Sequence, residues 1–146
     1  YSGKDFMKKV TISITGKQKY DNAPSDVIEL ITAGNMVYKN GSYYITYKES
    51  MLTGMEGCTT LVKVDKDEKV SITRYGKYSS HLEFKKDKNH FTKYVTENGE
   101  FDMSVDTLSL KSDLSDKGGN IAVRYNLQIN SSFVSENEIE LNIKEM

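Results

Sequence analysis

Several polar side chains fall at positions where strand alternation predicts an inward direction. Arg74 continues the apolar face of its strand, and Thr60 lies opposite it on the neighbouring strand. The same alternation directs Glu56, Glu49 and His90 inward. An arginine guanidinium forms paired hydrogen bonds with carboxylates and with other anions. The cluster therefore predicts either an internal arginine–glutamate ion pair or a site where Arg74 binds a ligand anion. A third alternative is that the strand pairing is displaced by one residue, which would place Arg74 at an exposed rim position.

A glycine-containing segment precedes the strand that carries Thr60. It reads Thr53, Gly54, Met55, Glu56 and Gly57. Glycine readily adopts positive φ, so this loop either forms a backbone anion-binding nest or turns a corner of the barrel. The adjoining Cys58 is expected to be a small buried apolar side chain, because this register places no histidine beside it.

Four tyrosines, Tyr43, Tyr47, Tyr94 and Tyr125, are predicted to face the interior. Their rings and hydroxyl groups suit the wall of an amphipathic cavity, and they equally suit ordinary filling of a barrel. The sequence pattern is compatible with either arrangement.

The sequence predicts no metal site, cofactor or catalytic centre. The register places His90 inside and His81 outside, and the acidic residues lack the spacing of metal ligands. No nucleophile–base pair or phosphate-binding loop is recognisable, so an enzyme is the least favoured class of function.

Composition restricts the class of protein further. A chain of 146 residues with a net charge of -1 is expected to form one domain and has no basic field for nucleic acid. No apolar run is long enough for a membrane span. The single cysteine favours a reducing cytoplasm. Residues 1–6 are expected to be a tag remnant or disordered, and residues 7–146 to form the domain; oligomeric state is left open.

The elements that must position these residues are short alternating runs separated by turns. Ten strands are predicted, at residues 8–17, 27–39, 42–49, 57–65, 69–75, 78–85, 88–96, 100–113, 119–129 and 136–144. Helix is nearly absent from the pattern. An antiparallel up-and-down meander of this length satisfies its edges best by closing into a barrel.

Turn chemistry predicts the register of several hairpins. A two-residue turn at Asn40-Gly41 gives the first three pairs below, and the turn at residues 66–68 gives the next three. Later turns give the last four, and a loss of phase near Asp106 and Thr107 predicts a β-bulge. The pairs are Tyr38–Tyr43, Met36–Ile45, Gly34–Tyr47, Val64–Val70, Val62–Ile72, Thr60–Arg74, Phe84–His90, Leu82–Thr92, Thr96–Phe101 and Tyr94–Met103. Ile28, Leu30 and Tyr38 are expected on the interior face.

Three runs carry a resemblance to a known family: residues 41–50, residues 53–57 and residues 72–84. The chain resembles the YwiB-like family of uncharacterised small bacterial proteins over residues 10–143. The resemblance implies a lipocalin-like (calycin) β-barrel of unknown function, and it supplies no catalytic residue.

The leading expectation for function is a cytoplasmic binding module that holds a small amphipathic or anionic molecule inside the barrel. The alternative is an interaction or regulatory protein with a filled core. Interior volume distinguishes the two. Residues 18–26 are too few for the helical lid of fatty-acid-binding barrels, so a fatty acid is not specifically indicated.

Overall fold

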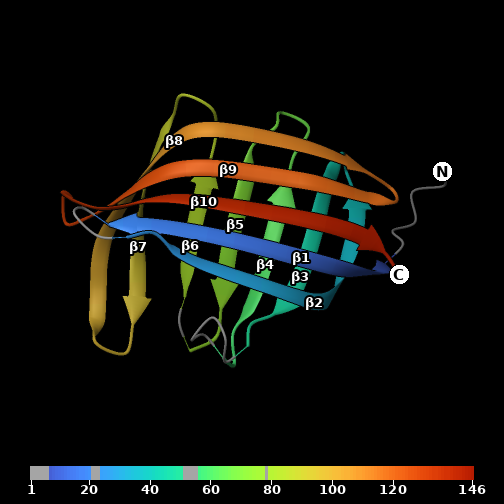
Figure 1. Ribbon diagram of the computed structural model, residues 1–146, viewed down its shortest axis with the longest axis horizontal. Coiled ribbons are helices and arrows are strands. Elements are labelled where there is room, and N and C mark those ends of the chain that lie inside the picture. The colour runs from blue at the N-terminus through green and yellow to red at the C-terminus, as the bar shows by residue number, and fades with distance from the viewer. Residues whose placement is uncertain (1–6, 21–23, 51–55, 78) are drawn as a thin grey trace.

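The computed structural model describes residues 7–20, 24–50, 56–77 and 79–146 (Figure 1). The prediction for residues 1–6 falls outside this part. All ten predicted strands are confirmed, each with bounds within a few residues of those expected. They are β1 (Met7–Tyr20), β2 (Asp26–Lys39), β3 (Ser42–Lys48), β4 (Thr59–Val64), β5 (Val70–Tyr75), β6 (Ser80–Phe84), β7 (Asn89–Thr96), β8 (Gly99–Ser115), β9 (Gly118–Ile129) and β10 (Ser132–Glu145).

The strands form one antiparallel sheet in the order β6-β5-β4-β3-β2-β1-β10-β9-β8-β7. In Figure 1, β1, β2, β10, β9 and the long part of β8 form a front layer that crosses in front of β3 to β7. The first and last strands pair along most of their length, from Val10–Glu145 to Tyr20–Ser135. The sheet thus curls into a nearly closed barrel, as predicted.

The remaining gap lies between β6 and β7, which are neighbours in sequence. Their backbones meet at an isolated bridge between Ser79 and Val95 and at the turn where Lys88 N–H donates to the Lys85 carbonyl. The predicted ladder pairs Phe84–His90 and Leu82–Thr92 are therefore wrong. We call this gap between β6 and β7 the seam.

The register predicted from the first two turns is confirmed for all six pairs. The β7–β8 hairpin differs, because Thr96 pairs with Gly99 and Tyr94 with Phe101. The predicted pairs Thr96–Phe101 and Tyr94–Met103 are wrong by two residues. A shift of two leaves every side chain on its predicted face, because side chains alternate with period two.

The predicted β-bulge in β8 is confirmed. The β8–β9 register shifts between Thr107 and Ser109, directly after Asp106 makes the last pair with β7. A bulge bends its strand. The bend lets β8 leave β7 and continue in the front layer (Figure 1).

The core fills the space between the two layers with aliphatic and aromatic side chains, among them Val10, Ile12, Ile45, Phe84 and Val105, each 0% exposed. Gly34 allows β3 to lie close against β2, because an added Cβ would lie 2.3 Å from the Thr46 carbonyl oxygen and 3.3 Å from Tyr47 Cβ. Ile28 and Tyr38, expected on the interior face, are nevertheless 47% and 48% exposed, because they lie near the ends of β2.

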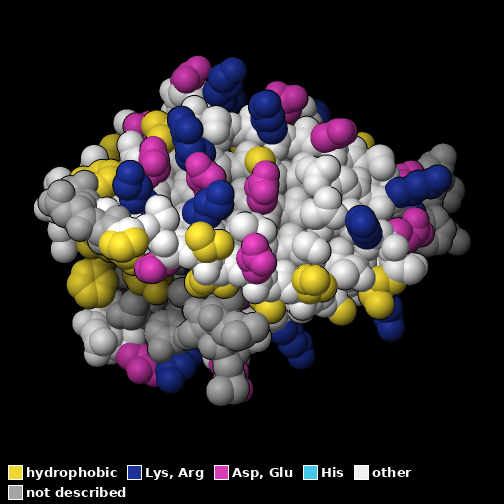
Figure 2. All heavy atoms as spheres, in the orientation of Figure 1, with side chains coloured by type: hydrophobic (Ala, Val, Ile, Leu, Met, Phe, Trp, Pro, Cys, Tyr) yellow, Lys and Arg dark blue, Asp and Glu magenta, His cyan; other side chains and the backbone are white. Residues whose placement is uncertain are grey.

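The outer surface of the front layer is polar, with acidic and basic side chains interspersed over it (Figure 2). No helix in the described part of the chain is long and apolar enough to span a membrane.

Candidate functional site

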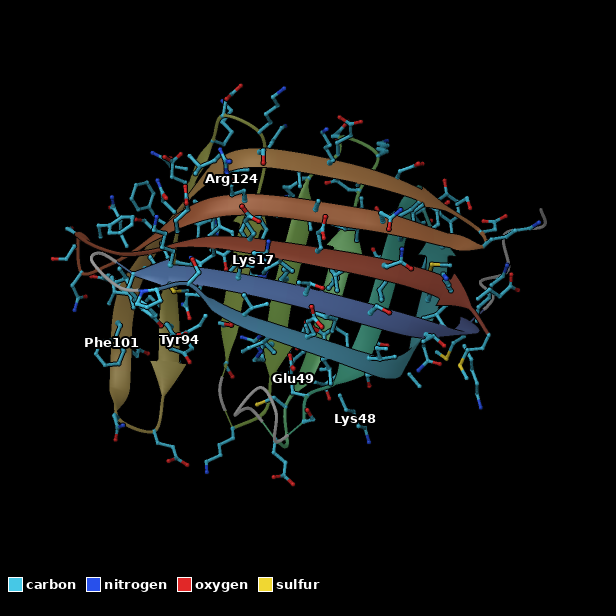
Figure 3. All side chains as sticks on the ribbon, in the orientation of Figure 1. Lys17, Lys48, Glu49, Tyr94, Phe101 and Arg124 are labelled. Carbon is cyan, nitrogen blue, oxygen red and sulfur yellow. The ribbon has the colours of Figure 1, made fainter. Side chains whose placement is uncertain are left out.

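The centre of the candidate site is a buried carboxylate. Glu49 directly follows β3, and its backbone N–H donates to the Cys58 carbonyl at 2.9 Å, which extends the pairing of β3 with the chain before β4. Alternation then exposes Lys48 and turns Glu49 inward, where its side chain is 2% exposed (Figure 3). Thr60 Oγ1 donates a hydrogen bond to Glu49 Oε2.

Arg74 supplies the opposite charge from β5. It lies across from Thr60 in the β4–β5 ladder, and its Nη2 is 3.5 Å from Glu49 Oε2. The Arg74 side chain is 21% exposed. Its Nε atom is buried and has no hydrogen-bond partner among the described residues. The ion pair therefore leaves part of the guanidinium donor capacity unused.

Two buried tyrosines complete the surroundings. Burial raises the pKa of Tyr47 to about 12, and the Glu49 charge adds to the increase, whereas Arg74 and Thr60 oppose it. Burial also raises the pKa of Tyr125 to about 12, against the effect of the Arg74 charge. Both phenols therefore stay neutral at physiological pH and present hydroxyl groups rather than charges.

A cavity of about 180 Å³ adjoins this cluster. It lies between β1, β2 and β10 on one side and β3 to β5 on the other. Glu49, Arg74 and Tyr47 form its polar part. The rest of its wall consists of Gly16 and aliphatic side chains, namely Ile14, Ile28, Leu30, Val62, Ile72, Ile139 and Leu141. Ile28 thus does face the interior, at a position where the barrel remains open to solvent.

The structure brings together Glu49, Thr60, Arg74 and Tyr47, with Tyr125 close enough for its pKa to respond to Arg74. The prediction that Glu56 points inward is wrong, because Glu56 is exposed. Gly57, at φ +89°, turns the chain before β4 begins, so the strand alternation does not extend back to residue 56. Thr53, Gly54 and Met55 lie outside the described residues.

Three other predicted site residues lie elsewhere in the barrel. Tyr43 is at the opposite end of β3, with its ring centroid 4.7 Å from that of Tyr38, and its pKa is raised by burial and by the Asp116 charge. Tyr94 is on β7, paired with Phe101 near the end of the β7–β8 hairpin (Figure 3). His90 lies at the seam, where its contact is with His81.

The predicted separation of His81 and His90 is wrong. They were expected on opposite faces and hence apart, yet their ring centroids are 5.8 Å apart. Alternation separates the two histidines only if β6 and β7 form a ladder, and these strands do not pair at this level. The sequence contained a signal that was missed: His81 and Glu83 are two residues apart on one strand and so share a face.

The raised phenol pKa values predict a decline in stability at high pH. A folded-state pKa of about 12, above the ordinary 10.0, means that the folded protein holds these protons more tightly than the unfolded chain. The resulting stabilisation is complete below pH 10 and is lost as the pH rises towards 12. We expect Tyr47→Phe to show a smaller loss of stability than the parent protein over this interval, as measured by urea unfolding. Equal losses in the two proteins would contradict the assigned burial of this phenol.

Comparison with known proteins places the chain among uncharacterised β-barrels. Residues 12–141 match the DUF1934 family, described as a domain of unknown function. The chain is 29% identical to the uncharacterized beta-barrel protein YwiB of Bacillus subtilis (strain 168) over 109 residues. This alignment covers 75% of each protein. The crystal structure of the ywiB protein from Bacillus subtilis superposes with a TM-score of 0.84 at 22% identity, covering 96% of this chain and 93% of the other. This structural similarity shows the shared fold.

Proposed function

Because the chain belongs to the DUF1934 family, which carries no assigned function, we propose a function from the site itself: the barrel binds a small amphipathic anion, with Arg74 as its anchor. The observation that carries the proposal is the buried Nε of Arg74, which has no hydrogen-bond partner in the described part of the chain and belongs to a residue that lines a largely apolar cavity. A buried donor without a partner is costly, and a ligand carboxylate would satisfy it.

The cavity supports the amphipathic part of the proposal. Aliphatic side chains form most of its wall, whereas its charged groups are Glu49 and Arg74. A ligand with one anionic group and a short hydrocarbon portion matches this division. The cavity volume of about 180 Å³ is below the roughly 300–1,000 Å³ that is typical of sites for drug-sized molecules, so it favours a compact ligand.

Glu49 gives the proposal a testable consequence, because its carboxylate competes with a ligand carboxylate for the Arg74 guanidinium. The Nη2–Oε2 separation of 3.5 Å is long for a charge-assisted hydrogen bond, which is ordinarily about 2.7–2.9 Å. An incoming carboxylate can therefore use the remaining donors of Arg74 without first breaking a short ion pair. Removal of the Glu49 charge should then increase affinity for anions.

Calorimetric titration with monocarboxylates from butyrate to octanoate tests the proposal, with the corresponding alcohols as uncharged controls. We expect the parent protein to prefer the acids, Glu49→Gln to bind them more tightly, and the double variant Glu49→Gln/Arg74→Met to lose the preference. Arg124→Met, at an exposed position on β9, serves as the matched control and should bind like the parent.

Two outcomes would refute the proposal. One is the absence of acid binding in both the parent and Glu49→Gln. The other is an acid preference that persists in the double variant. Either would favour the alternative of an interaction protein that does not use its interior. Native mass spectrometry of protein purified from its own host would identify a natural ligand by its co-purified mass.

The proposed compartment is the cytoplasm. Cys58 is buried and is the chain's single cysteine, so the sequence offers no disulfide partner, which suits a reducing environment.

A further inference from the structure

We propose that His81, Glu83 and His90 form a binding site for a divalent transition-metal ion, of which Zn²⁺ is the representative, and that the ion joins the two sides of the seam. Each of the three residues offers one ligand atom, and these atoms all lie within 4.8 Å of one another. Two histidines and one carboxylate are an established ligand set for Zn²⁺ and related ions. This proposal is independent of the anion site at Arg74.

The separations are close to those that coordination requires. Ligand atoms about 2.1 Å from a tetrahedral metal ion lie roughly 3.4 Å from one another. His81 Nε2 and Glu83 Oε2 are already 2.8 Å apart. The His81 and His90 rings meet edge to face, at 79°. Because all three ligand atoms lie within 4.8 Å of one another, any pair needs to close by no more than about 1.4 Å to reach this spacing.

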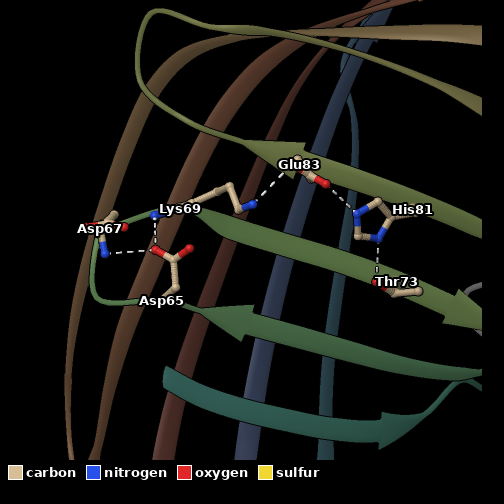
Figure 4. A network of polar contacts seen from close by, with 6 residues as sticks. All are labelled: Asp65, Asp67, Lys69, Thr73, His81 and Glu83. Atoms are coloured by element: carbon tan, nitrogen blue, oxygen red, sulfur yellow. Dashed lines mark hydrogen bonds and ion pairs between the residues drawn. The ribbon is translucent and has the colours of Figure 1, made fainter. Parts of the chain in front are cut away.

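A hydrogen bond from outside the ligand set orients His81. Its Nδ1 is 2.7 Å from Thr73 Oγ1 on β5, the residue paired with His81 in the ladder (Figure 4). When the ring binds a metal through Nε2, Nδ1–H donates to the threonine hydroxyl. Such partners fix the tautomer and the ring direction of metal-binding histidines. In the neutral tautomer with the proton on Nε2, Nε2–H donates to Glu83 and Nδ1 accepts from the threonine hydroxyl.

The Glu83 carboxylate has separate partners for its two oxygens. Oε1 forms an ion pair with Lys69 Nζ at 3.4 Å, whereas Oε2 faces His81 (Figure 4). Its pKa is lowered, first by the hydrogen bond with His81 and then by Lys69, against the effect of burial. A metal ion at Oε2 therefore leaves the Lys69 contact intact, although the lysine charge reduces the attraction for a cation.

A second observation that points to a ligand is an unsatisfied nitrogen of His90. Its Nε2 atom is buried and has no hydrogen-bond partner among the described residues. Buried polar atoms are nearly always satisfied, so one that is not calls for an explanation. A metal ion held by this imidazole, or a water molecule bound to the ion, would provide a partner for a ring nitrogen of His90.

The position of the cluster indicates what the metal would do. His81 and Glu83 belong to β6 and His90 to β7. Coordination therefore connects two strands whose backbones, among the described residues, meet at the Ser79–Val95 bridge and at the turn between them. The His81 and Glu83 side chains are 43% and 32% exposed, which leaves a coordination position open to water. The expected result is a barrel closed at its seam in the metal-bound state.

The test uses the full chain without an affinity tag, stripped of metal by a chelator. We expect Zn²⁺ to bind with 1:1 stoichiometry in calorimetry and to raise the melting temperature, and Co²⁺ to give the visible absorption of a nitrogen- and oxygen-ligated site. Mg²⁺ and Ca²⁺ should do neither, because they prefer oxygen ligands. His90→Gln and Glu83→Gln should each weaken Zn²⁺ binding at least tenfold and abolish the thermal shift.

Two variants serve as controls. Glu100→Gln, at an exposed position on β8, should bind Zn²⁺ like the parent. Lys69→Gln should bind it more tightly, because it removes the competing charge while retaining all three ligands. The site is refuted if Zn²⁺ binds no more tightly than a dissociation constant of about 100 μM. It is also refuted if binding survives unchanged in folded His90→Gln and Glu83→Gln.

Discussion

Replacement of Arg74 by Met is expected to lower the free energy of unfolding by about 3 kcal/mol. The substitution leaves the Glu49 carboxylate, 2% exposed, with Thr60 as its remaining polar contact in the ion-pair cluster. Removal of one partner of a buried ion pair typically costs about 3–5 kcal/mol. The partial exposure of Arg74 places the expected loss at the lower end of this range.

The same loss should be largely recovered when Glu49→Gln is added to Arg74→Met, because the stranded charge is then gone. Urea unfolding of the parent, the two single variants and the double variant gives a coupling energy, expected to be about 0.5–3 kcal/mol. Arg124→Met should change stability by no more than about 0.5 kcal/mol, as is usual for an exposed side chain. Additive effects of the two substitutions would show that the pair is not energetically coupled.

Phe84→Ala should be the most destabilising single truncation among the aromatic residues, with a loss of about 3–5 kcal/mol. Phe84 is 0% exposed and its ring centroid lies 4.7 Å from that of Tyr125. The cost has two parts: the lost burial of the ring, and a void that its neighbours fill only in part. Because Phe84 ends β6, the void would open directly beside the seam.

Phe91 on the adjacent β7 is the matched control, since it is 76% exposed. Phe91→Ala is expected to change the free energy of unfolding by no more than about 0.5 kcal/mol. Chemical denaturation with both variants provides the comparison. A loss at Phe91 equal to that at Phe84 would show that the outer face of β7 is packed against another surface in solution.

The amino-acid sequence determined the local part of this fold. Asn40-Gly41 and the turn at residues 66–68 set six strand pairs correctly, because turn geometry and alternation act between residues close together in the chain. The same local rules placed the bulge near Thr107, and they directed Arg74 towards the interior. Meander topology followed from the short connections, and barrel closure from the need to satisfy the sheet edges.

The tertiary structure alone decided how the polar residues are grouped. Arg74 pairs with Glu49 rather than Glu56, since the turn at Gly57 takes residue 56 out of strand alternation. Likewise the barrel closes between β1 and β10 and stays open between β6 and β7, although the latter are adjacent in sequence. Strand twist and curvature, summed over ten strands, set the place of this gap, and no single turn encodes that sum. His81 and His90 meet there because the pairing rules that would have separated them do not operate across the seam.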